Sequence, residues 1–351
     1  MKILHLHDES WDSGLAHYAL SLAQTQQNCG HDVYFWAQRG SFAAKAARAA
    51  GLAAREIGSP WAALPSLRQA AKAAGVEIIN AHTGSAHSLA AALAFGRKIA
   101  VVRTWADARL PAASFGRRFL ARRTALFIGA NSPITAALAA AFPFVRARRV
   151  LPGIPDFPAE LKAPPAEPVI GVLGRLDPVK GHDDVLDAAA IVCKQYPKAV
   201  FLAAGEGRQE RLSKLRWQAD VLGLGQKIKF LGRVPDAAEF IDGCSIGLVA
   251  SRGSEAVSRA ALEWMARGRP IVATRAGGLP DLVAHGETGL LIPPRNPQLM
   301  AKAVSGLIAD PAFARKAGQS GRERFLLHFG LDAFAAATQE AYEDALGHLS
   351  R

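Results

Sequence analysis

Two glutamates, eight residues apart, are the side chains of this sequence that point most directly to chemistry. Glu255 and Glu263 lie in SEAVSRAALEWMARGRPIVATRAGG, among mostly apolar residues and ahead of a Gly-Gly turn. This pattern predicts a largely buried helix that Glu255 opens, and ionised carboxylates are rarely kept there without a partner. Eight helical residues rise about 12 Å, whereas the paired carboxyls of a glycosidase lie about 5–5.5 Å or 6.5–9.5 Å apart. We therefore expect the pair to hold the two ends of a long, hydroxyl-rich ligand.

Short apolar runs alternate with alanine-rich stretches along the whole chain, and this alternation predicts parallel sheets covered by helices on both faces. The series occurs twice, separated by IPDFPAELKAPPAEP, which has the proline content of a linker. We expect an N-terminal domain over residues 1–160, a C-terminal domain over 161–330, and a closing helix over 331–351 that packs back towards the N-terminal domain.

Ligands of such sheets bind beyond the carboxyl ends of the strands. Polar residues and glycines that end predicted strands should therefore line a cleft between the two domains. These residues are His7, Asp8, His82, Thr83, Arg103, Asn131, Ser132, Gly153, Gly174, Arg175 and Glu206.

The net charge of +12 is unevenly distributed, because residues 1–163 carry +10 and residues 164–351 carry +2. This asymmetry favours an anionic partner for the first half, and arginine used for solubility alone is the alternative. Neither a signal peptide nor a membrane-spanning run is expected. Three scattered cysteines, Cys29, Cys193 and Cys244, are predicted to be buried, reduced thiols, so a cytoplasmic location is expected.

The second half carries a series of motifs, in the order GRLDPVKG, AAGEG, FLGRV, EAVSRAALEWMARGRPIVAT and AGGLPDLVAHGETGLLIPP. Through them the chain resembles the retaining glycosyltransferases of family 4 (glycosyl transferases group 1). The first half resembles the same family more loosely, in WDSGLAHYALSLA, EIINAH and LPGIPDF, and RTWADARLP is similar to members that act on lipopolysaccharide-type acceptors. The resemblance implies the α/β GT-B fold, in which two Rossmann-like, doubly wound domains face a central cleft. The N-terminal domain would bind the acceptor and the C-terminal domain the nucleotide sugar.

These motifs differ from the family pattern at two places. Ser13-Gly14 replaces the usual Gly-Gly of the first loop, and Val257-Ser258 replaces the Phe-Gly that usually follows the first glutamate. Ser258 still allows close backbone approach and could cap a helix. The departures therefore bear on the preference for a donor sugar more than on activity.

The resemblance also implies a way to stabilise the departing diphosphate without a metal ion. Arg175 and Lys180 would supply the positive charge, and Gly14 would let backbone amides approach the same phosphates. The alternative for Arg175 and Lys180 is an ordinary surface pair at a strand–helix turn.

For the donor sugar, the resemblance assigns Glu255 to the sugar hydroxyls and to positive charge at the anomeric carbon, and Glu263 to the ribose hydroxyls. The backbone at Val257 and Ser258 would add donors to the sugar. The alternative for the glutamates is a carboxylate at a helix start and an ordinary mid-helix glutamate.

Further contacts would come from the backbone around Arg233 and Val234, which would read the base, and from His82, which would contact the donor sugar near the reacting centre. A histidine with a purely structural role is the alternative for His82. Two acidic and histidine-containing groups lack convincing zinc spacing. These are His5, His7 and Asp8, and His182, Asp183 and Asp184. Asp183 and Asp184 are expected to cap a helix and compensate its dipole.

The expected activity is therefore the retaining transfer of a sugar from a UDP-, GDP- or ADP-sugar to a hydroxyl of a glycan or lipid-linked acceptor, in lipopolysaccharide or other cell-envelope polysaccharide synthesis. No permanently bound cofactor and no metal are expected. The acceptor would attack from the face that the leaving phosphate occupies, with that phosphate as base. A GT-B disaccharide phosphorylase and a non-catalytic membrane- or glycan-binding protein with a vestigial site are the alternatives.

The segment FGRRFLARRTALF predicts a peripheral contact with the inner face of the cytoplasmic membrane, because it sets basic residues beside apolar ones. The basic residues are Arg117, Arg118, Arg122 and Arg123, and a second basic group follows at Arg146, Arg148 and Arg149. The alternative is a solvated helix face whose aromatic residues pack inward. Nucleic acid is not an expected partner, since no recognised nucleic-acid-binding module accompanies the charge.

Overall fold

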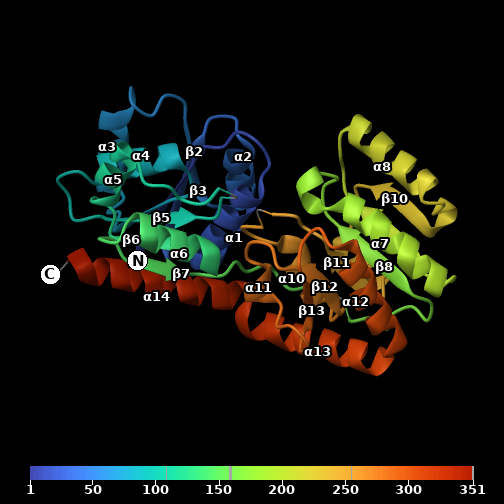
Figure 1. Ribbon diagram of the computed structural model, residues 1–351. Coiled ribbons are helices and arrows are strands. Elements are labelled where there is room, and N and C mark those ends of the chain that lie inside the picture. The colour runs from blue at the N-terminus through green and yellow to red at the C-terminus, as the bar shows by residue number, and fades with distance from the viewer. Residues whose placement is uncertain (108, 158–159, 254, 350–351) are drawn as a thin grey trace. The chain divides into compact units, whose positions relative to one another are not determined.

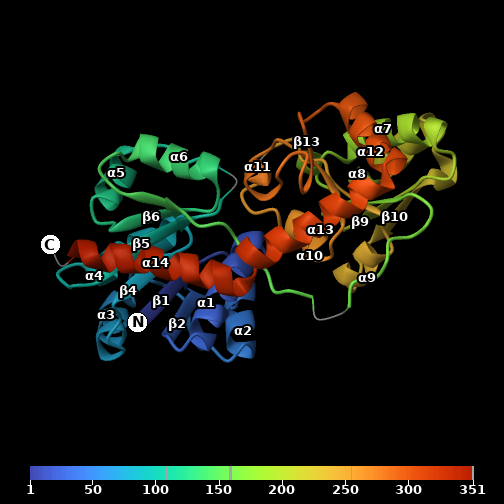
Figure 2. The same cartoon turned by 90° about the horizontal axis from the view of Figure 1, so that it is seen from below.

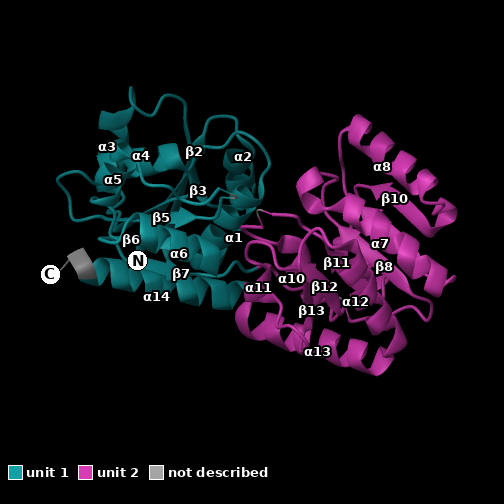
Figure 3. Ribbon diagram, in the orientation of Figure 1, with its two compact units in different colours: residues 1–153, 330–351 teal, residues 154–329 magenta. Residues whose placement is uncertain are grey.

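The computed structural model describes residues 1–107, 109–157, 160–253 and 255–349, and the chain divides into two compact units (Figure 3). One unit is Met1–Gly153 together with Gly330–Arg351, and the other is Ile154–Phe329. Both are α/β units with a parallel sheet, which confirms the predicted fold class. The proline-rich segment at the expected boundary near residue 160 lies in the second unit, so the first crossing between the units falls at residues 153 and 154.

The described part of the first unit forms a seven-stranded parallel sheet in the order β3-β2-β1-β4-β5-β6-β7 (Figure 1). Its strands are β1 (Lys2–His7), β2 (Asp32–Gln38), β3 (Ala53–Ile57), β4 (Ile78–Ala81), β5 (Ala100–Trp105), β6 (Leu126–Gly129) and β7 (Ala147–Arg149). Its helices are α1 (Gly14–Asn28), α2 (Phe42–Ala49), α3 (Leu64–Ala73), α4 (Gly84–Ala94), α5 (Phe115–Ala121), α6 (Ser132–Ala141) and α14 (Leu331–Leu349).

Short polar residues start several of these helices where a strand's loop ends. Ser13, Thr83 and Asn131 are the N-caps of α1, α4 and α6, and each side chain accepts a hydrogen bond from a backbone N–H of the first turn. The alanines of α1 and α2 pack on one face of the sheet, and α3 and α4 pack on the other. The caps thus set where each helix begins, and small side chains let the helices lie close to the strands.

Helix α14 comes last in the chain but packs on the first unit, alongside α1, β5 and β6 (Figures 1 and 2). The ring of Phe334 meets Tyr18 edge-on, with 4.8 Å between the centroids. Asn80 Nδ2 donates to the hydroxyl of Tyr342 at 2.7 Å, inside the core. The core of this unit therefore includes residues from both of its chain segments.

The described part of the second unit forms a six-stranded parallel sheet in the order β10-β9-β8-β11-β12-β13. Its strands are β8 (Val169–Leu173), β9 (Val200–Ala204), β10 (Ile228–Gly232), β11 (Ile246–Val249), β12 (Ile271–Thr274) and β13 (Gly289–Ile292). Its helices are α7 (His182–Gln195), α8 (Gln209–Val221), α9 (Ala237–Asp242), α10 (Arg259–Ala266), α11 (Leu279–Leu282), α12 (Pro297–Ala309) and α13 (Pro311–His328), with short 3-10 turns η1 (Pro178–Lys180) and η2 (Gly225–Lys227).

A buried tryptophan of α10 sets how closely that helix approaches the second sheet. A Cβ added to Gly171 or Gly247 would lie 2.5 Å and 2.4 Å from the indole of Trp264, so the ring occupies the space that these glycines leave. Helices α7, α8 and α12 form the core against the strands with larger aliphatic side chains. The close approach of α10 brings the segment that precedes it to the end of β11.

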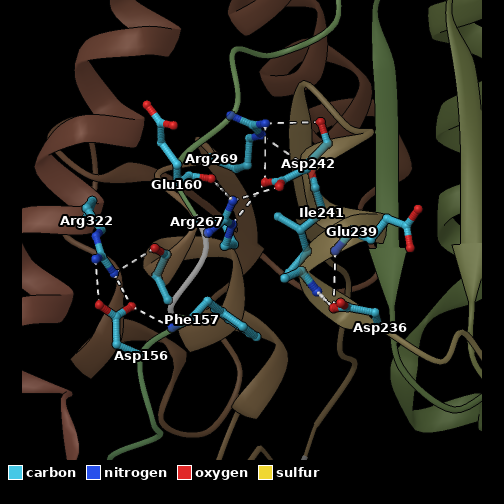
Figure 4. A network of polar contacts seen from close by, with 12 residues as sticks. Asp156, Phe157, Glu160, Asp236, Glu239, Ile241, Asp242, Arg267, Arg269 and Arg322 are labelled. Carbon is cyan, nitrogen blue, oxygen red and sulfur yellow. Dashed lines mark hydrogen bonds and ion pairs between the residues drawn. The ribbon is translucent and has the colours of Figure 1, made fainter.

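A network of polar contacts, buried around Asp242 and partly exposed at Asp156, ties the proline-rich segment to the second unit (Figure 4). The Arg267 guanidinium donates to both carboxylate oxygens of Asp242 at 2.9 and 2.7 Å, and to the carbonyl of Glu160 at 2.7 Å. Arg322, from α13, pairs with both oxygens of Asp156. These contacts explain in physical terms why residues 154–157 and 160 belong to the second unit.

Of the three thiols predicted to be buried, only Cys244 is fully buried. Cys29 is exposed, Cys193 is half-buried and Cys244 is buried, and all three are free thiols. The prediction of a buried Cys29 is wrong, because this residue follows the last turn of α1 at the surface. None of the described helices combines the length and apolarity that crossing a membrane requires.

Candidate functional site

Each sheet has a point where the strand order reverses, and the candidate residues gather at these points. In the second unit the reversal lies between β8 and β11, and Lys180 and Glu255 follow these two strands. In the first unit the reversal lies between β1, whose last residue is His7, and β4, which is followed by His82. Ligands of open α/β sheets bind at such points, beyond the carboxyl ends of the strands.

Glu255 is buried and shares one oxygen between two donors. Its side chain is 2% exposed, and its Oε1 lies 2.5 Å from Nζ of Lys180 and accepts a hydrogen bond from Ser251 Oγ. Lys180 remains 29% exposed, so its ammonium is still reachable from solvent. A buried carboxylate needs such charge-assisted donors to stay ionised.

Ser251 was not among the predicted site residues, because a serine that follows a strand carries no distinctive signal in a sequence. Thr274 Oγ1, from the neighbouring strand β12, donates to the carbonyl of Ser251 at 2.6 Å and holds its backbone in place. Ser251 thus acts on the Glu255 carboxylate from a fixed position at the end of β11.

Two glycines let the loops of this site approach each other. Gly181 has a φ of 71°, and a Cβ there would lie 2.0 Å from the carbonyl oxygen of Ala250. Gly277 has a φ of 52°, and its Cβ would lie 2.4 Å from the carbonyl oxygen of Glu255, which accepts a hydrogen bond from Gly278 N at 2.7 Å. Only glycine fits both the conformation and the space at these positions, so the Gly-Gly turn holds the backbone of Glu255.

The expectation that Glu255 opens a helix shared with Glu263 is wrong. Helix α10 begins at Arg259, and Glu255 lies in the preceding loop. The separation of about 12 Å along one helix therefore does not apply. Ser258 is the N-cap residue of α10, although its side chain makes no capping hydrogen bond to the described residues.

Glu263 lies inside α10 and has a partner one turn earlier. Its carboxylate is 7% exposed and accepts a hydrogen bond from Arg259 Nε at 2.7 Å. Burial raises the pKa of Glu263, and the charge of Arg259 opposes that rise. The arginine explains how this carboxylate is kept among apolar neighbours.

Arg175 lies apart from the Lys180–Glu255 pair, at a cavity of about 560 Å³. Its side chain is 76% exposed and approaches Asp177 at 3.5 Å. Arg208 and Lys214 also line this cavity, from the loop after β9 and from α8. Carboxylates line the cavity as well, namely Asp177, Glu206 and Glu210, and of the charged lining residues Arg175 and Glu206 were expected from the sequence.

Asp183 and Asp184 form ion pairs at the start of α7. Asp183 accepts two hydrogen bonds from Arg211, at 2.9 and 2.6 Å, and Asp184 accepts two from Arg252, at 2.7 and 2.6 Å. Both lie in the first turn of α7, whose N-cap is Gly181. They occupy the position that compensates a helix dipole, as expected, but neither carboxylate is the N-cap.

The other predicted contacts with the nucleotide sugar lie in loops or at the start of a helix. Gly14 is the first residue of α1, and a Cβ added to it would meet nothing within 4 Å. Arg233 is exposed and Val234 half-buried in the loop after β10, and Val257 is half-buried ahead of α10. Within the described ranges, no group of three or more His, Cys, Asp or Glu side chains is placed to hold a metal ion.

His82 belongs to a chain of buried hydrogen bonds in the first unit. His5 Nε2 lies 2.8 Å from Gln26 Oε1, and His5 Nδ1 lies 2.9 Å from His82 Nε2. Burial lowers the pKa of His5 to about 4 and that of His82 well below its ordinary value, so both rings are neutral at pH 7. Because the Gln26 oxygen only accepts, His5 donates to it, and His82 Nε2 must donate to His5 Nδ1. His82 Nδ1 is then an acceptor, and no described residue donates to it.

Acidification is expected to destabilise the protein through its buried histidines. The pKa of His182 falls from 6.5 to about 4 on burial, so the unfolded chain binds a proton first as the pH falls from 6.5 towards 4. The free energy of unfolding therefore decreases over that range, by roughly 3 kcal/mol for this residue. Urea unfolding at pH 7, 6, 5 and 4.5 measures the effect. H182L should lose less stability than the wild type over the same pH range. An unchanged pH dependence in H182L would contradict the assignment.

Two family models match consecutive parts of the chain. Glycosyltransferase family 4 matches residues 13–154, and glycosyl transferases group 1 matches residues 154–324. A D-inositol 3-phosphate glycosyltransferase of Streptomyces bingchenggensis is 33% identical over 202 residues, which are 54% of this chain and 43% of that protein. The lipopolysaccharide core biosynthesis mannosyltransferase LpcC of Rhizobium leguminosarum is 28% identical over 186 residues, 52% of this chain and 53% of that protein. The chain thus spans about half the length of these curated relatives.

Solved structures share the whole fold. The crystal structure of Anabaena Alr3699/HepE in complex with UDP superposes with a TM-score of 0.85 at 21% identity and covers 98% of this chain and 100% of that chain. A glycosyltransferase of Rickettsia africae superposes with a TM-score of 0.86 at 16% identity, over 98% and 99% of the two chains. The two family matches and the two parallel-sheet units point to the same family. The chain belongs to the GT-B glycosyltransferases of family 4 (glycosyl transferases group 1).

Proposed function

We propose that this protein is a retaining glycosyltransferase that moves a sugar from a nucleotide-diphosphate sugar to a hydroxyl of a glycan or lipid-linked acceptor. The observation that carries the proposal is the buried Glu255 carboxylate, held by Lys180 and Ser251 where the strand order of the second sheet reverses. Such a position binds ligands in open α/β sheets. A fixed negative charge there favours positive charge that develops on a sugar ring.

The diphosphate of the donor would be bound by Lys180, which pairs with this carboxylate, and by Arg175 from the same loop after β8. The ammonium of Lys180 has three N–H donors, one of which points to Glu255, and the partly exposed group can direct others to phosphate oxygens. Arg175, which is largely exposed, offers a planar guanidinium with several donors. These cations would neutralise the leaving phosphate without a metal ion, and Gly14 leaves open space for close approach of a phosphate.

The remaining donor contacts follow from the family. Glu263 would turn from Arg259 to the ribose hydroxyls, the backbone at Val257 and Ser258 would donate to the sugar, and the loop of Arg233 and Val234 would read the base. The Nδ1 of His82, to which no described residue donates, is suited to accept a hydrogen bond from a hydroxyl in the transfer step. Retention would come from attack on the face that the leaving phosphate occupies.

The name of one relative supports a role in envelope glycan synthesis, and the other names bear on the nucleotide and on the kind of acceptor. One is a lipopolysaccharide core mannosyltransferase and several are D-inositol 3-phosphate glycosyltransferases, and Alr3699/HepE was solved with UDP. For this chain we propose a UDP-, GDP- or ADP-sugar as the donor and an envelope polysaccharide or lipopolysaccharide precursor as the acceptor.

A peripheral contact with the inner face of an anionic membrane is part of the proposal. Phe115 of α5 is 92% exposed and Phe119 52%, so the alternative in which these rings pack inward is wrong for them. Basic residues beside exposed apolar ones suit a membrane surface. The basic residues of this helix and its end are Arg117, Arg118, Arg122 and Arg123. The second basic group is partly neutralised, because Arg146 and Arg148 pair with Asp344.

Loss of the Lys180 ammonium is expected to weaken binding of a nucleoside diphosphate at least tenfold. Charge-assisted hydrogen bonds contribute about 1.5–3 kcal/mol each, and tenfold corresponds to about 1.4 kcal/mol. Calorimetric titration of UDP, GDP and ADP into wild type and K180A measures the change. Uridine or guanosine without phosphates should bind the two proteins equally.

The exposed Lys198, which pairs with Glu167, provides the matched control, and K198A should bind like the wild type. If K180A binds the diphosphate as tightly as the wild type, the phosphate-binding role is wrong. A wild type that binds orthophosphate and a disaccharide but no nucleotide would favour the phosphorylase instead.

A further inference from the structure

The first unit contains a cavity of about 570 Å³ that the proposed donor site does not use. It lies at the carboxyl edge of the sheet, because Arg103 and Trp105 from the end of β5 and Gly84 from the start of α4 line it, with Arg117 and Phe119 of α5. Its volume falls within the range of small-molecule sites, about 300–1,000 Å³. The cavity is therefore large enough for a sugar with its substituents.

Arg103 brings a buried positive charge to this cavity. The residue is 3% exposed, and its guanidinium donates to the carbonyls of Ala81 and Thr104. Its Nε has no hydrogen-bond partner among the described residues. No described carboxylate forms an ion pair with Arg103, although Asp107, which also lines the cavity, and Asp8 and Glu9 act on its charge. A buried cation without a paired anion is costly to the fold, which points to an anion from outside the chain.

Arg117 adds a second cation from a different element. It is exposed on α5, donates to the carbonyl of Ala112 at 3.0 Å, and is close enough to Arg103 for their charges to repel. Two like charges that line one cavity are stabilised by an anion between or beside them. The described lining of the cavity thus carries two cations, Arg103 and Arg117, against one carboxylate, Asp107, and this excess of positive charge favours an anionic ligand.

Two aromatic rings give the cavity walls that fit a sugar. The ring of Trp105 is held by a hydrogen bond from its Nε1 to the carbonyl of Arg109 at 2.9 Å, and the Arg103 guanidinium lies 4.9 Å from that ring. Phe119 of α5 also lines the cavity, and the Arg123 guanidinium lies 4.6 Å from the centroid of its ring. The electron-rich faces of aromatic rings attract the weakly positive C–H bonds of a sugar ring.

We propose that this cavity binds the acceptor through an anionic substituent, a phosphate or a carboxylate carried by a sugar ring. Arg103 and Arg117 contact the anion, and Trp105 and Phe119 contact the ring. That the ligand is the acceptor rests on the proposed function. The anion-binding cavity itself lies in the first unit and requires no nucleotide.

Calorimetric titration of the full chain, without nucleotide, tests this proposal with four probes. Glucose 6-phosphate and glucuronate should each bind at least tenfold more tightly than glucose, and the stronger of the two identifies the phosphate or the carboxylate as the preferred anion. Inorganic phosphate should bind more weakly than glucose 6-phosphate, because it has no ring to contact Trp105. Equal affinities for glucose and both anionic sugars would overturn the proposal.

A matched pair of variants separates the cavity from general electrostatics. R117Q should weaken glucose 6-phosphate binding at least fivefold, whereas R118Q, which removes the same charge from the same helix but outside the cavity lining, should leave it within twofold. W105L should weaken glucose 6-phosphate and glucuronate alike and leave inorganic phosphate unchanged. These variants avoid the buried Arg103, whose removal could unfold the unit.

Two outcomes would count against the cavity. Equal losses of glucose 6-phosphate affinity in R117Q and R118Q would mean that the total charge of α5, and not the cavity, attracts the anion. Loss of binding to vesicles of phosphatidylglycerol and phosphatidylcholine, with sugar-phosphate affinity unchanged in R117Q, would assign Arg117 to a membrane. The donor proposal is tested separately by nucleotide titration. A chain that binds glucose 6-phosphate as expected but no nucleotide would leave the cavity standing and overturn the donor site.

Discussion

Replacing Glu255 with glutamine is expected to lower kcat about 100-fold or more, while nucleotide binding and the fold are largely kept. Glutamine has the same shape as glutamate and can still accept the hydrogen bonds of Lys180 and Ser251. It lacks the negative charge that stabilises positive charge at the anomeric carbon, and loss of one preorganised electrostatic group costs about 10²–10³ in kcat. The effect is measured on the slow hydrolysis of a nucleotide sugar, which needs no known acceptor. The donor is the nucleotide sugar that most stabilises the wild type against unfolding, and release of the nucleoside diphosphate reports the rate.

The exposed Glu287 of the same unit provides the control, and E287Q should hydrolyse the donor at the wild-type rate. If the kcat of E255Q equals that of the wild type, the prediction of a catalytic role for Glu255 is wrong. A large rise in KM with unchanged kcat would instead show that Glu255 only binds the ground state of the donor.

Substituting Arg267 with leucine is expected to lower the free energy of unfolding by about 3–5 kcal/mol. The Arg267 side chain is completely buried and makes two hydrogen bonds to Asp242 and one to the carbonyl of Glu160. Its loss leaves the Asp242 carboxylate buried, with Arg269 at 3.7 Å as its remaining cation. Urea unfolding of the full chain at pH 7 gives the change.

Two comparisons make this result specific to the ion pair. R216L, on the exposed face of α8, should change stability by no more than about 0.5 kcal/mol. Adding D242L to R267L should recover part of the loss, because the uncompensated charge is then gone. Equal stability of R267L and the wild type would show that the network in Figure 4 contributes little.

The sequence alone predicts both sheets, because buried parallel strands read as apolar, β-branched runs between alanine-rich helices. It also locates Lys180 and Glu255, but not how they meet. The contact depends on the order of β8 and β11 in the sheet, which local patterns do not contain. The same holds for His5 and His82, which lie 77 residues apart in the chain and side by side at the reversal of the first sheet.

The error at Glu255 has a local cause. The segment before Arg259 contains residues that favour helices, so it reads as the first turn of α10. The Glu255 carbonyl instead accepts a hydrogen bond from Gly278 N, and the Glu255 backbone packs closely against Gly277. This tertiary contact overrides helix propensity. Arg208 and Lys214 are missed for a related reason, since ordinary surface cations become part of a cavity only through the packing of α8.

The packing of α14 on the first unit also has a consequence for how the molecule is made. A ribosome delivers Tyr18 and Asn80 early, but their partners Phe334 and Tyr342 emerge only after the whole second unit has been synthesised. The second unit is one continuous segment and can form its core as soon as it leaves the exit tunnel. The first unit must wait with part of its apolar surface uncovered, so the unit that begins the chain is the last to be completed.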